Sequence, residues 1–293
     1  MRYSFAAIAV SGLVLGLAGA ATAPAADAPC KLTLTNPLFA FDNAVGRGVL
    51  KPEQQAAILS ELGYAGIGYT GTRNIPAMLK ALDARGLKMF STYVGASVDP
   101  KKPKYDVGLP EAIQQLKGRD TILWLFMTGG KPSGTESDDV AVGIVREVAD
   151  LAQTANLRVV LYPHVGMYVA RVEDAIRIVK KAQRKNVGVA LNLCHWLKLD
   201  KEENLQQRLR EAMPYLMLVS INGADHEGDW PRLIQTLDRG QFDVYNFLKT
   251  LRALGYTGPI GLQGYNIQGV PQENLRHSMA AWRKFVDRMA SEP

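Results

Sequence analysis

The chain has 293 residues, of which 47% are hydrophobic and 21% are charged, and its formal net charge is +6. This length and composition are typical of one large globular domain or two small ones, with enough apolar residues for a sizeable core. The positive charge is spread over many predicted helix faces. This distribution argues against a nucleic-acid-binding protein, which would have a dense basic surface.

The N-terminus predicts a secretory signal peptide. Arg2 precedes an apolar stretch over residues 5–17, and the small residues 18–20 match a cleavage signal. We expect a signal peptide over 1–20, a short lead-in over 21–30, a mature domain over 31–293 and a periplasmic or extracellular location. The alternative is an uncleaved membrane anchor, for which the apolar stretch is short. No later stretch is apolar enough to predict an integral membrane segment after cleavage.

Predicted strands and helices alternate along the rest of the chain. Residues 31–35, "KLTLT", predict the first strand, and residues 51–63 predict the first helix, with proline in its first turn and glycine at its end. The later strands are predicted at 65–70, 87–94, 121–127, 157–163, 186–193, 216–223 and 258–265. The later helices are predicted at 74–86, 109–118, 136–156, 172–183, 201–213, 243–256 and 271–290.

Eight strand–helix units in about 260 residues predict a single (β/α)8 TIM barrel of the α/β class. The strands are apolar with little alternation, as expected for parallel strands that are buried on both faces. A dinucleotide-binding fold is the weaker alternative, because no Gly-x-Gly-x-x-Gly follows the first strand. In such a barrel the functional residues lie at the carboxyl ends of the strands.

Three of the four histidines fall at predicted strand ends. His164 follows the fifth strand, His195 the sixth and His226 the seventh, whereas His277 lies in the last helix as a surface or packing residue. Neutral histidine can move a proton near pH 7 or bind a metal, so His164 and His195 are the leading catalytic candidates. His226 is a weaker candidate because it sits in a polar loop.

Amides, hydroxyls and aromatic rings follow the same strand ends. Amides and hydroxyls both donate and accept hydrogen bonds, which suits sugar hydroxyls, and aromatic rings can pack on sugar C–H faces. Core packing would also explain the aromatic residues. The polar candidates are Asn36, Asp42, Thr128, Tyr162, Asn192, Asn222, Asp225, Gln263 and Asn266, and the aromatic candidates are Phe41, Tyr93, Trp196 and Trp230.

Four motifs extend these observations to nearly the whole mature chain. They are "VVLYPHVG" at 159–166, "VGVALNLCHW" at 187–196, "LVSINGAD" at 218–225 and "LDRGQFDVYNFLKTLRALGYTGPIGLQ" at 237–263. In these motifs the chain resembles the xylose isomerase-like TIM-barrel superfamily, the sugar phosphate isomerase/epimerase group. The resemblance implies the same barrel fold and a small-molecule sugar or sugar derivative as the partner.

The resemblance also implies one divalent cation, held by a Glu, an Asp, a His and a second Glu on the last four strands. The matching positions here are the neutral residues Tyr162, Asn192, Asn222 and Gln263. Loss of three carboxylates removes most of the charge that holds a hard cation. One remaining possibility is a softer site for zinc or manganese, made of His164, His195 and amide oxygens. The other is acid–base chemistry without a metal.

Two functional hypotheses follow. In the first, an exported enzyme isomerises, epimerises or cleaves a sugar by proton transfer next to a carbonyl. His195 polarises a substrate oxygen, His164 assists proton transfer, and Tyr162 is a second proton carrier or oxyanion donor. The predicted sugar contacts are Asn36, Asn192, Asn222, Asp225, Gln263 and Trp196. The second hypothesis is a non-catalytic carbohydrate-binding barrel. A metal-dependent phosphodiesterase or DNA-repair nuclease is disfavoured, because such a site needs more metal ligands than four histidines supply.

The chain has two cysteines, Cys30 and Cys194. The predicted strands place Cys30 at the start of the first strand and Cys194 at the end of a later one, at opposite ends of a parallel sheet. We therefore expect two free thiols.

Overall fold

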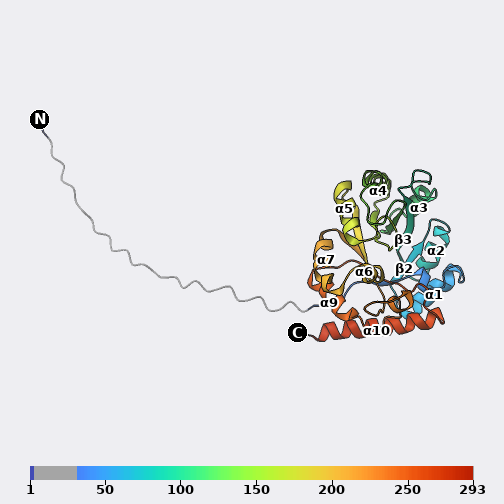
Figure 1. Ribbon diagram of the computed structural model, residues 1–293. Coiled ribbons are helices and arrows are strands. Elements are labelled where there is room, and N and C mark those ends of the chain that lie inside the picture. Colours follow the sequence, from blue (N-terminus) through green and yellow to red (C-terminus); the bar gives the residue numbers. More distant parts are fainter. Residues whose placement is uncertain (3–31, 293) are drawn as a thin grey trace. The chain divides into compact units, whose positions relative to one another are not determined.

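Eight parallel strands close into a barrel in the computed structural model, which describes residues 1–2 and 32–292 (Figure 1). Each strand pairs with the next along the chain, and β1 closes the barrel by pairing with β8. This confirms the predicted (β/α)8 fold. The strands are β1 Leu38–Phe41, β2 Gly66–Thr70, β3 Lys88–Ser97, β4 Ile122–Thr128, β5 Arg158–Leu161, β6 Val187–Asn192, β7 Leu216–Ile221 and β8 Ile260–Leu262.

Helices surround the barrel between successive strands, as strict alternation requires. They are α1 Pro52–Leu62, α2 Ile75–Asp83, α3 Leu109–Gln115, α4 Asp138–Gln153, α5 Val172–Ala182, α6 Leu193–Leu199, α7 Leu205–Ala212, α8 Trp230–Leu233, α9 Val244–Ala253 and α10 Pro271–Ser291. Short 3-10 helices lie at η1 Asp42–Ala44, η2 Glu202–Asn204 and η3 Met213–Tyr215. Within the described residues, none of the helices is long and apolar enough to cross a membrane.

The first strand is not where the sequence predicted it. Residues 32–35 form no strand, and the barrel begins at Leu38, three residues after the predicted strand ends. In β1, Ala40 pairs with both Ile67 of β2 and Leu262 of β8. The alternating "KLTLT" matches the strand pattern locally. The four apolar residues "LFAF" form the strand instead, because this position lies between β2 and β8 and all four side chains are buried there. The signal-peptide prediction and Cys30 fall almost entirely outside the described residues.

The core has two parts. Apolar faces of the helices pack against the outside of the barrel, as in α4, where Ala141, Val145 and Val148 recur at helical spacing and are buried. A separate aromatic cluster fills the inside of the barrel. In it Trp124 stacks on Phe41 with ring centroids 4.5 Å apart and contacts Tyr162 at 4.0 Å. These rings form the floor of the space at the carboxyl ends of the strands.

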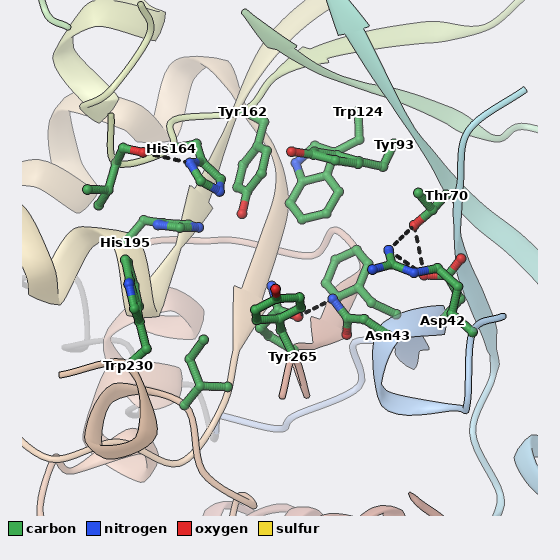
Figure 2. Close-up of a pocket in the computed structure, with 15 residues that line it drawn as sticks. Asp42, Asn43, Thr70, Tyr93, Trp124, Tyr162, His164, His195, Trp230 and Tyr265 are labelled. Atoms are coloured by element: carbon green, nitrogen blue, oxygen red, sulfur yellow. Dashed lines mark hydrogen bonds and ion pairs between the residues drawn. The ribbon is translucent and has the colours of Figure 1, made fainter. Parts of the chain in front are cut away.

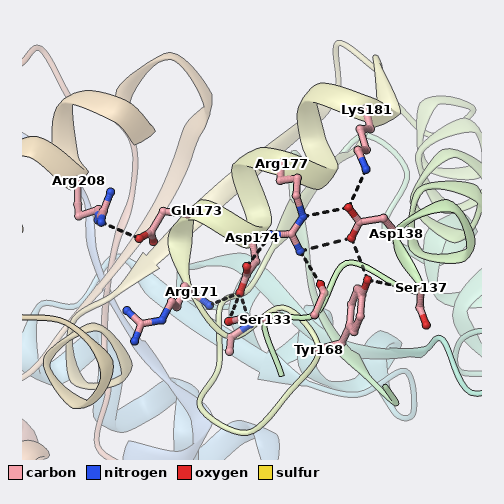
Figure 3. A network of polar contacts seen from close by, with 12 residues as sticks. Ser133, Ser137, Asp138, Tyr168, Arg171, Glu173, Asp174, Arg177, Lys181 and Arg208 are labelled. Carbon is pink, nitrogen blue, oxygen red and sulfur yellow. Dashed lines mark hydrogen bonds and ion pairs between the residues drawn. The ribbon is translucent and has the colours of Figure 1, made fainter. Parts of the chain in front are cut away.

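Charged side chains join α4 to α5 and hold the loops that follow β4 and β5 (Figure 3). The buried carboxylate of Asp138 accepts hydrogen bonds from Tyr168 Oη at 2.8 Å, Arg177 Nε at 3.0 Å and Lys181 Nζ at 2.7 Å. Asp174 accepts from the backbone N–H of Arg171 at 2.9 Å, which caps the start of α5. Because Tyr168 also donates its backbone N–H to Met127 O, the network fixes the loop after β5.

Candidate functional site

A cavity of about 530 Å³ opens at the carboxyl ends of the strands (Figure 2). This is the volume range of small-molecule sites, and the position is that of active sites in TIM barrels. Three of the predicted catalytic or binding residues, Tyr162, His164 and His195, lie on one wall of it. The other lining residues are Phe41, Asp42, Asn43, Arg47, Thr70, Tyr93, Trp124, Val165, Trp230, Ile234, Gln263 and Tyr265.

His164 is held in one tautomer by its own loop. Its Nδ1 lies 2.8 Å from the carbonyl oxygen of Val165. Because a carbonyl oxygen only accepts, Nδ1 carries the proton, and Nε2 of the neutral ring is left with a free lone pair. Burial lowers the pKa of His164 below its ordinary 6.5, so the ring is neutral at pH 7. His164 is therefore a base whose accepting nitrogen is available to a ligand.

His195 lies directly beside His164, with ring centroids 3.9 Å apart. Its backbone N–H donates to Asn192 Oδ1 at 3.3 Å, which caps α6 and sets the position of the ring. Burial, and secondarily the neighbouring His164, hold the pKa of His195 well below 6.5. Its Nδ1 is buried without a partner among the described residues, which leaves Nε2 as the nitrogen on the cavity side.

Tyr162 completes this wall. Its ring centroid lies 5.5 Å from that of His164 and 5.6 Å from that of His195. Its hydroxyl oxygen accepts a hydrogen bond from Asn192 Nδ2 at 3.0 Å, and no acceptor for its own proton lies among the described residues. Burial raises the pKa of Tyr162 well above 10, so the phenol stays protonated. Tyr162 is thus a fixed hydrogen-bond donor toward the cavity.

A charged pair forms the opposite side of the cavity. The buried carboxylate of Asp42 accepts from Thr70 Oγ1 at 2.8 Å and lies 3.5 Å from Arg47 Nη1. Arg47 Nη1 also donates to Thr70 Oγ1 at 2.8 Å. Burial raises the pKa of Asp42, and the contacts with Thr70 and Arg47 oppose this. Sequence analysis named Asp42 and missed Arg47 and Thr70. The available signal was an arginine between Gly46 and Gly48 in the loop after a strand.

The residues at the family's metal positions do not fit a divalent cation. Asn192 uses both ends of its amide, since Oδ1 accepts from Cys194 Sγ and His195 N while Nδ2 donates to Tyr162 and Ser220. Asn222 points its Nδ2 at two backbone carbonyls, and Gln263 Oε1 accepts from Asn43 Nδ2 at 2.5 Å. Nowhere in 32–292 do three or more His, Cys, Asp or Glu side chains gather in a geometry that could hold a metal.

Several predicted sugar contacts lie away from the cavity. Asn36 precedes β1 and donates to Gly258 O at 2.7 Å, at the amino-terminal end of the barrel. It was placed at the site because the first strand was assigned too early in the sequence. Asp225 forms an ion pair with Arg232 at 2.9 Å. Neither Asp225 nor Asn222 lines the cavity.

Of the predicted sugar contacts, Gln263 lines the cavity. Trp196, the two outer histidines and Cys194 lie behind or outside it. Trp196 is buried behind His195 and lines a small separate pocket with Asn192. His226 pairs with Glu202 at the surface, and His277 is exposed on α10. Cys194 is a buried free thiol, and burial raises its pKa to about 12.

Solved structures of similar fold include two sugar epimerases and one barrel protein in complex with magnesium. The 3-keto-D-glucoside 4-epimerase of E. coli has 16% identity and a TM-score of 0.67, over 85% of this chain and 100% of that one. The D-allulose 3-epimerase of Methylomonas sp. has 14% identity and a TM-score of 0.70, over 87% and 99%. A xylose isomerase-like TIM-barrel protein of Mycobacterium smegmatis, solved in complex with magnesium, has 17% identity and a TM-score of 0.65, over 88% and 97%.

No curated protein matches the sequence significantly. The model of one protein family, described as xylose isomerase-like TIM barrel, matches residues 56–285. That range includes β2 to β8 and all three residues of the His164, His195 and Tyr162 wall. The chain belongs to the xylose isomerase-like TIM-barrel family.

Proposed function

We propose that this protein is an isomerase or epimerase that acts on a carbohydrate or sugar derivative by proton transfer next to a carbonyl. The observation that carries the proposal is the free Nε2 lone pair of His164, placed beside His195 and the Tyr162 phenol in one cavity. The similarity to sugar epimerases of the same fold supports the substrate class.

His164 acts as the general base. Its Nε2 takes the proton from the carbon next to the substrate carbonyl, and the electron pair moves into a carbon–carbon double bond and onto the carbonyl oxygen. The Nδ1–H bond to Val165 keeps the ring in the tautomer that can accept this proton. The lowered pKa keeps the ring unprotonated at pH 7, so no substrate binding energy is needed to deprotonate it.

Tyr162 and His195 bind the oxygen on which charge develops. The Tyr162 O–H donates to this oxygen from a buried position, where a hydrogen bond to an anion is stronger than in water. With its proton on Nε2, His195 donates to the same oxygen and polarises the carbonyl before proton transfer. His164 gives the isomer by delivering this proton to the former carbonyl carbon, while the hydroxyl proton passes between the two oxygens. Epimerisation needs a proton from the opposite face of the first carbon. Because Tyr162 lies on the same wall as His164, it stays the oxyanion donor, and water supplies that proton while His164 releases its own to solvent.

The experiment that tests the proposal is deuterium exchange. The protein is incubated in D2O with a panel of aldoses, ketoses and keto-glycosides, and deuterium at the carbon next to the carbonyl is followed by NMR. We expect at least one sugar to exchange, and His195→Ala to abolish this exchange while the circular dichroism spectrum is unchanged. His277→Ala, an exposed histidine on α10, is the matched control.

The competing function is a carbohydrate-binding barrel without catalysis. It predicts that a sugar binds with an affinity that chelators do not change and that no sugar in the panel ever exchanges deuterium. Exchange that survives in His195→Ala would instead show that His195 is not catalytic.

We further propose that the protein is exported, on the basis of the sequence of its first 20 residues. The test is the mass of the protein recovered from the cell envelope fraction of an expressing bacterium. Export predicts a chain that has lost about 20 residues, whereas a full-length chain in the membrane fraction supports the anchor alternative.

A further inference from the structure

The charge in the cavity is concentrated at one place. Among the described residues that line the cavity, Arg47 is the one permanent cation and Asp42 the one carboxylate. His164 and His195 are neutral at pH 7 because burial lowers their pKa values. Any ligand group that carries a charge will therefore be positioned by the Asp42–Arg47 side of the cavity.

The guanidinium of Arg47 is held by one of its three nitrogens. Nη1 donates to Thr70 Oγ1 at 2.8 Å and lies 3.5 Å from Asp42 Oδ1. Nε and Nη2 make no hydrogen bond to any residue in the part of the chain that the structure describes. The side chain is 41% exposed, whereas that of Asp42 is 3% exposed. One corner of the guanidinium is thus anchored, and its other donors are left available.

The loop that carries Arg47 is fixed before any ligand arrives. The backbone N–H of Arg47 donates to Asp42 O at 3.0 Å, which folds the loop back onto the end of β1. Gly46 and Gly48 on either side have φ of 81° and 77°, in the left-handed region that favours glycine. The position of the guanidinium is therefore set by the backbone as well as by Asp42 and Thr70, and little side-chain freedom is lost on binding.

From this arrangement we infer that Arg47 forms an anion subsite and that the ligand is a sugar acid, whose carboxylate takes the free donors of the guanidinium. The inference rests on the proposed function only in taking the ligand to be a sugar derivative. A planar carboxylate matches two parallel N–H donors of arginine. Tyr93, whose half-buried phenol also lines the cavity and stays protonated, is a further donor in the cavity.

A phosphate ester carries the same oxyanion chemistry but fits this subsite less well. It brings a charge of about −1.5 to −2 at pH 7, against −1 for a carboxylate. The buried Asp42 carboxylate beside Arg47 repels the larger charge more strongly, and no second cation among the described lining residues offsets it. The balance of charges at Arg47 therefore favours a carboxylate.

The test is binding, measured by isothermal titration calorimetry, so it needs no turnover. The probes are D-glucose with D-glucuronate, D-galactose with D-galacturonate, and glucose 6-phosphate. We expect at least one uronate to bind about 10- to 100-fold more tightly than its neutral partner and more tightly than the phosphate ester. Arg47→Met should remove this preference, and Arg47→Lys should retain part of it because the charge stays but the paired donors are lost.

Arg85→Met is the matched control, since Arg85 is exposed at the end of α2 and does not line the cavity. A uronate preference that survives in Arg47→Met, equal binding of acid and neutral sugar, tighter binding of the phosphate ester, or no binding by any probe each overturns the inference. The two proposals fail separately. A neutral sugar that exchanges deuterium without an acid preference refutes only the anion subsite, and a uronate that binds at Arg47 without exchange refutes only the catalytic proposal.

Discussion

Charged groups are distributed very differently in two parts of this barrel. In the contacts between α4 and α5, two buried carboxylates bind Arg177, one of them binds Lys181 as well, and together they fix the loops after β4 and β5 (Figure 3). In the cavity, the four positions at which the family holds a metal carry a phenol and three amides instead. The comparison teaches that the acidic side chains of α4 and α5 hold loops in place, one of which carries His164, while the histidine wall itself works with neutral groups.

Removal of the proposed base, like removal of His195, should have the largest effect. His164→Ala should lower the rate of deuterium exchange by about 10²- to 10⁴-fold, the usual contribution of a general base. The fold should be unchanged because His164 is only half buried and its ring bonds only to its own loop. The measurement is exchange by NMR at saturating sugar, with His277→Ala as the control. Equal rates in the two variants would remove His164 from the mechanism.

Disruption of the α4–α5 network should have the second-largest effect, which is a loss of stability. Asp138→Ala leaves the buried Tyr168 hydroxyl and two cations without their shared acceptor. We expect the free energy of unfolding to fall by about 2–3 kcal/mol. This is at or below the lower end of the usual cost of breaking a buried ion pair, because Arg177 and Lys181 can be solvated again in the variant. The measurement is the free energy of unfolding in urea. Asp150→Ala on the same helix removes a solvent-exposed pair with Arg184 and should change stability little, so similar losses in the two variants would contradict this role.

The neutral histidines should make stability depend on pH in a defined window. The pKa values of His164 and His195 lie below 6.5 in the folded protein and at their ordinary value in the unfolded chain. Between the two values the unfolded chain binds more protons, so the free energy of unfolding falls as pH falls below 6.5 and levels off below the folded pKa values. His195→Gln should flatten the slope in urea titrations across this range. A wild-type curve that is flat from pH 7 to 5 would show that the rings are not held neutral.

Chelation should have the smallest effect. Because the amides of Asn192 and Gln263 are engaged with protein partners and Asn222 does not line the cavity, we expect dialysed protein to contain far less than one equivalent of zinc or manganese. Prolonged EDTA treatment should leave sugar exchange and thermal stability unchanged. Plasma mass spectrometry checks the first expectation. About one equivalent of bound metal that is lost together with activity would restore the family's mechanism and break the comparison drawn above.

The sequence predicted the barrel and the three residues that meet in the histidine wall because both depend on local signals. Apolar runs alternating with amphipathic helices define the units, and strand ends in a barrel must converge, so His164 and His195 could be brought together without coordinates. The β1 strand was missed because its four residues are fixed by pairing with Gly66–Thr70 and Ile260–Leu262, far apart in the sequence. Arg47 was missed because a loop with two left-handed glycines has no periodicity to interpret.

The aromatic floor of the cavity places an intrinsic fluorophore, Trp124, at the candidate binding site. Trp124 lies between Phe41 and Tyr162 and contributes to the cavity lining, whereas Trp196 and Trp282 do not line it. A ligand that replaces water above this stack should alter the emission of Trp124, and Trp230 at the rim should report the same event from the solvent side. A Trp124→Phe variant separates the two signals. Candidate sugars can therefore be sorted by intrinsic fluorescence before any reaction product has been identified.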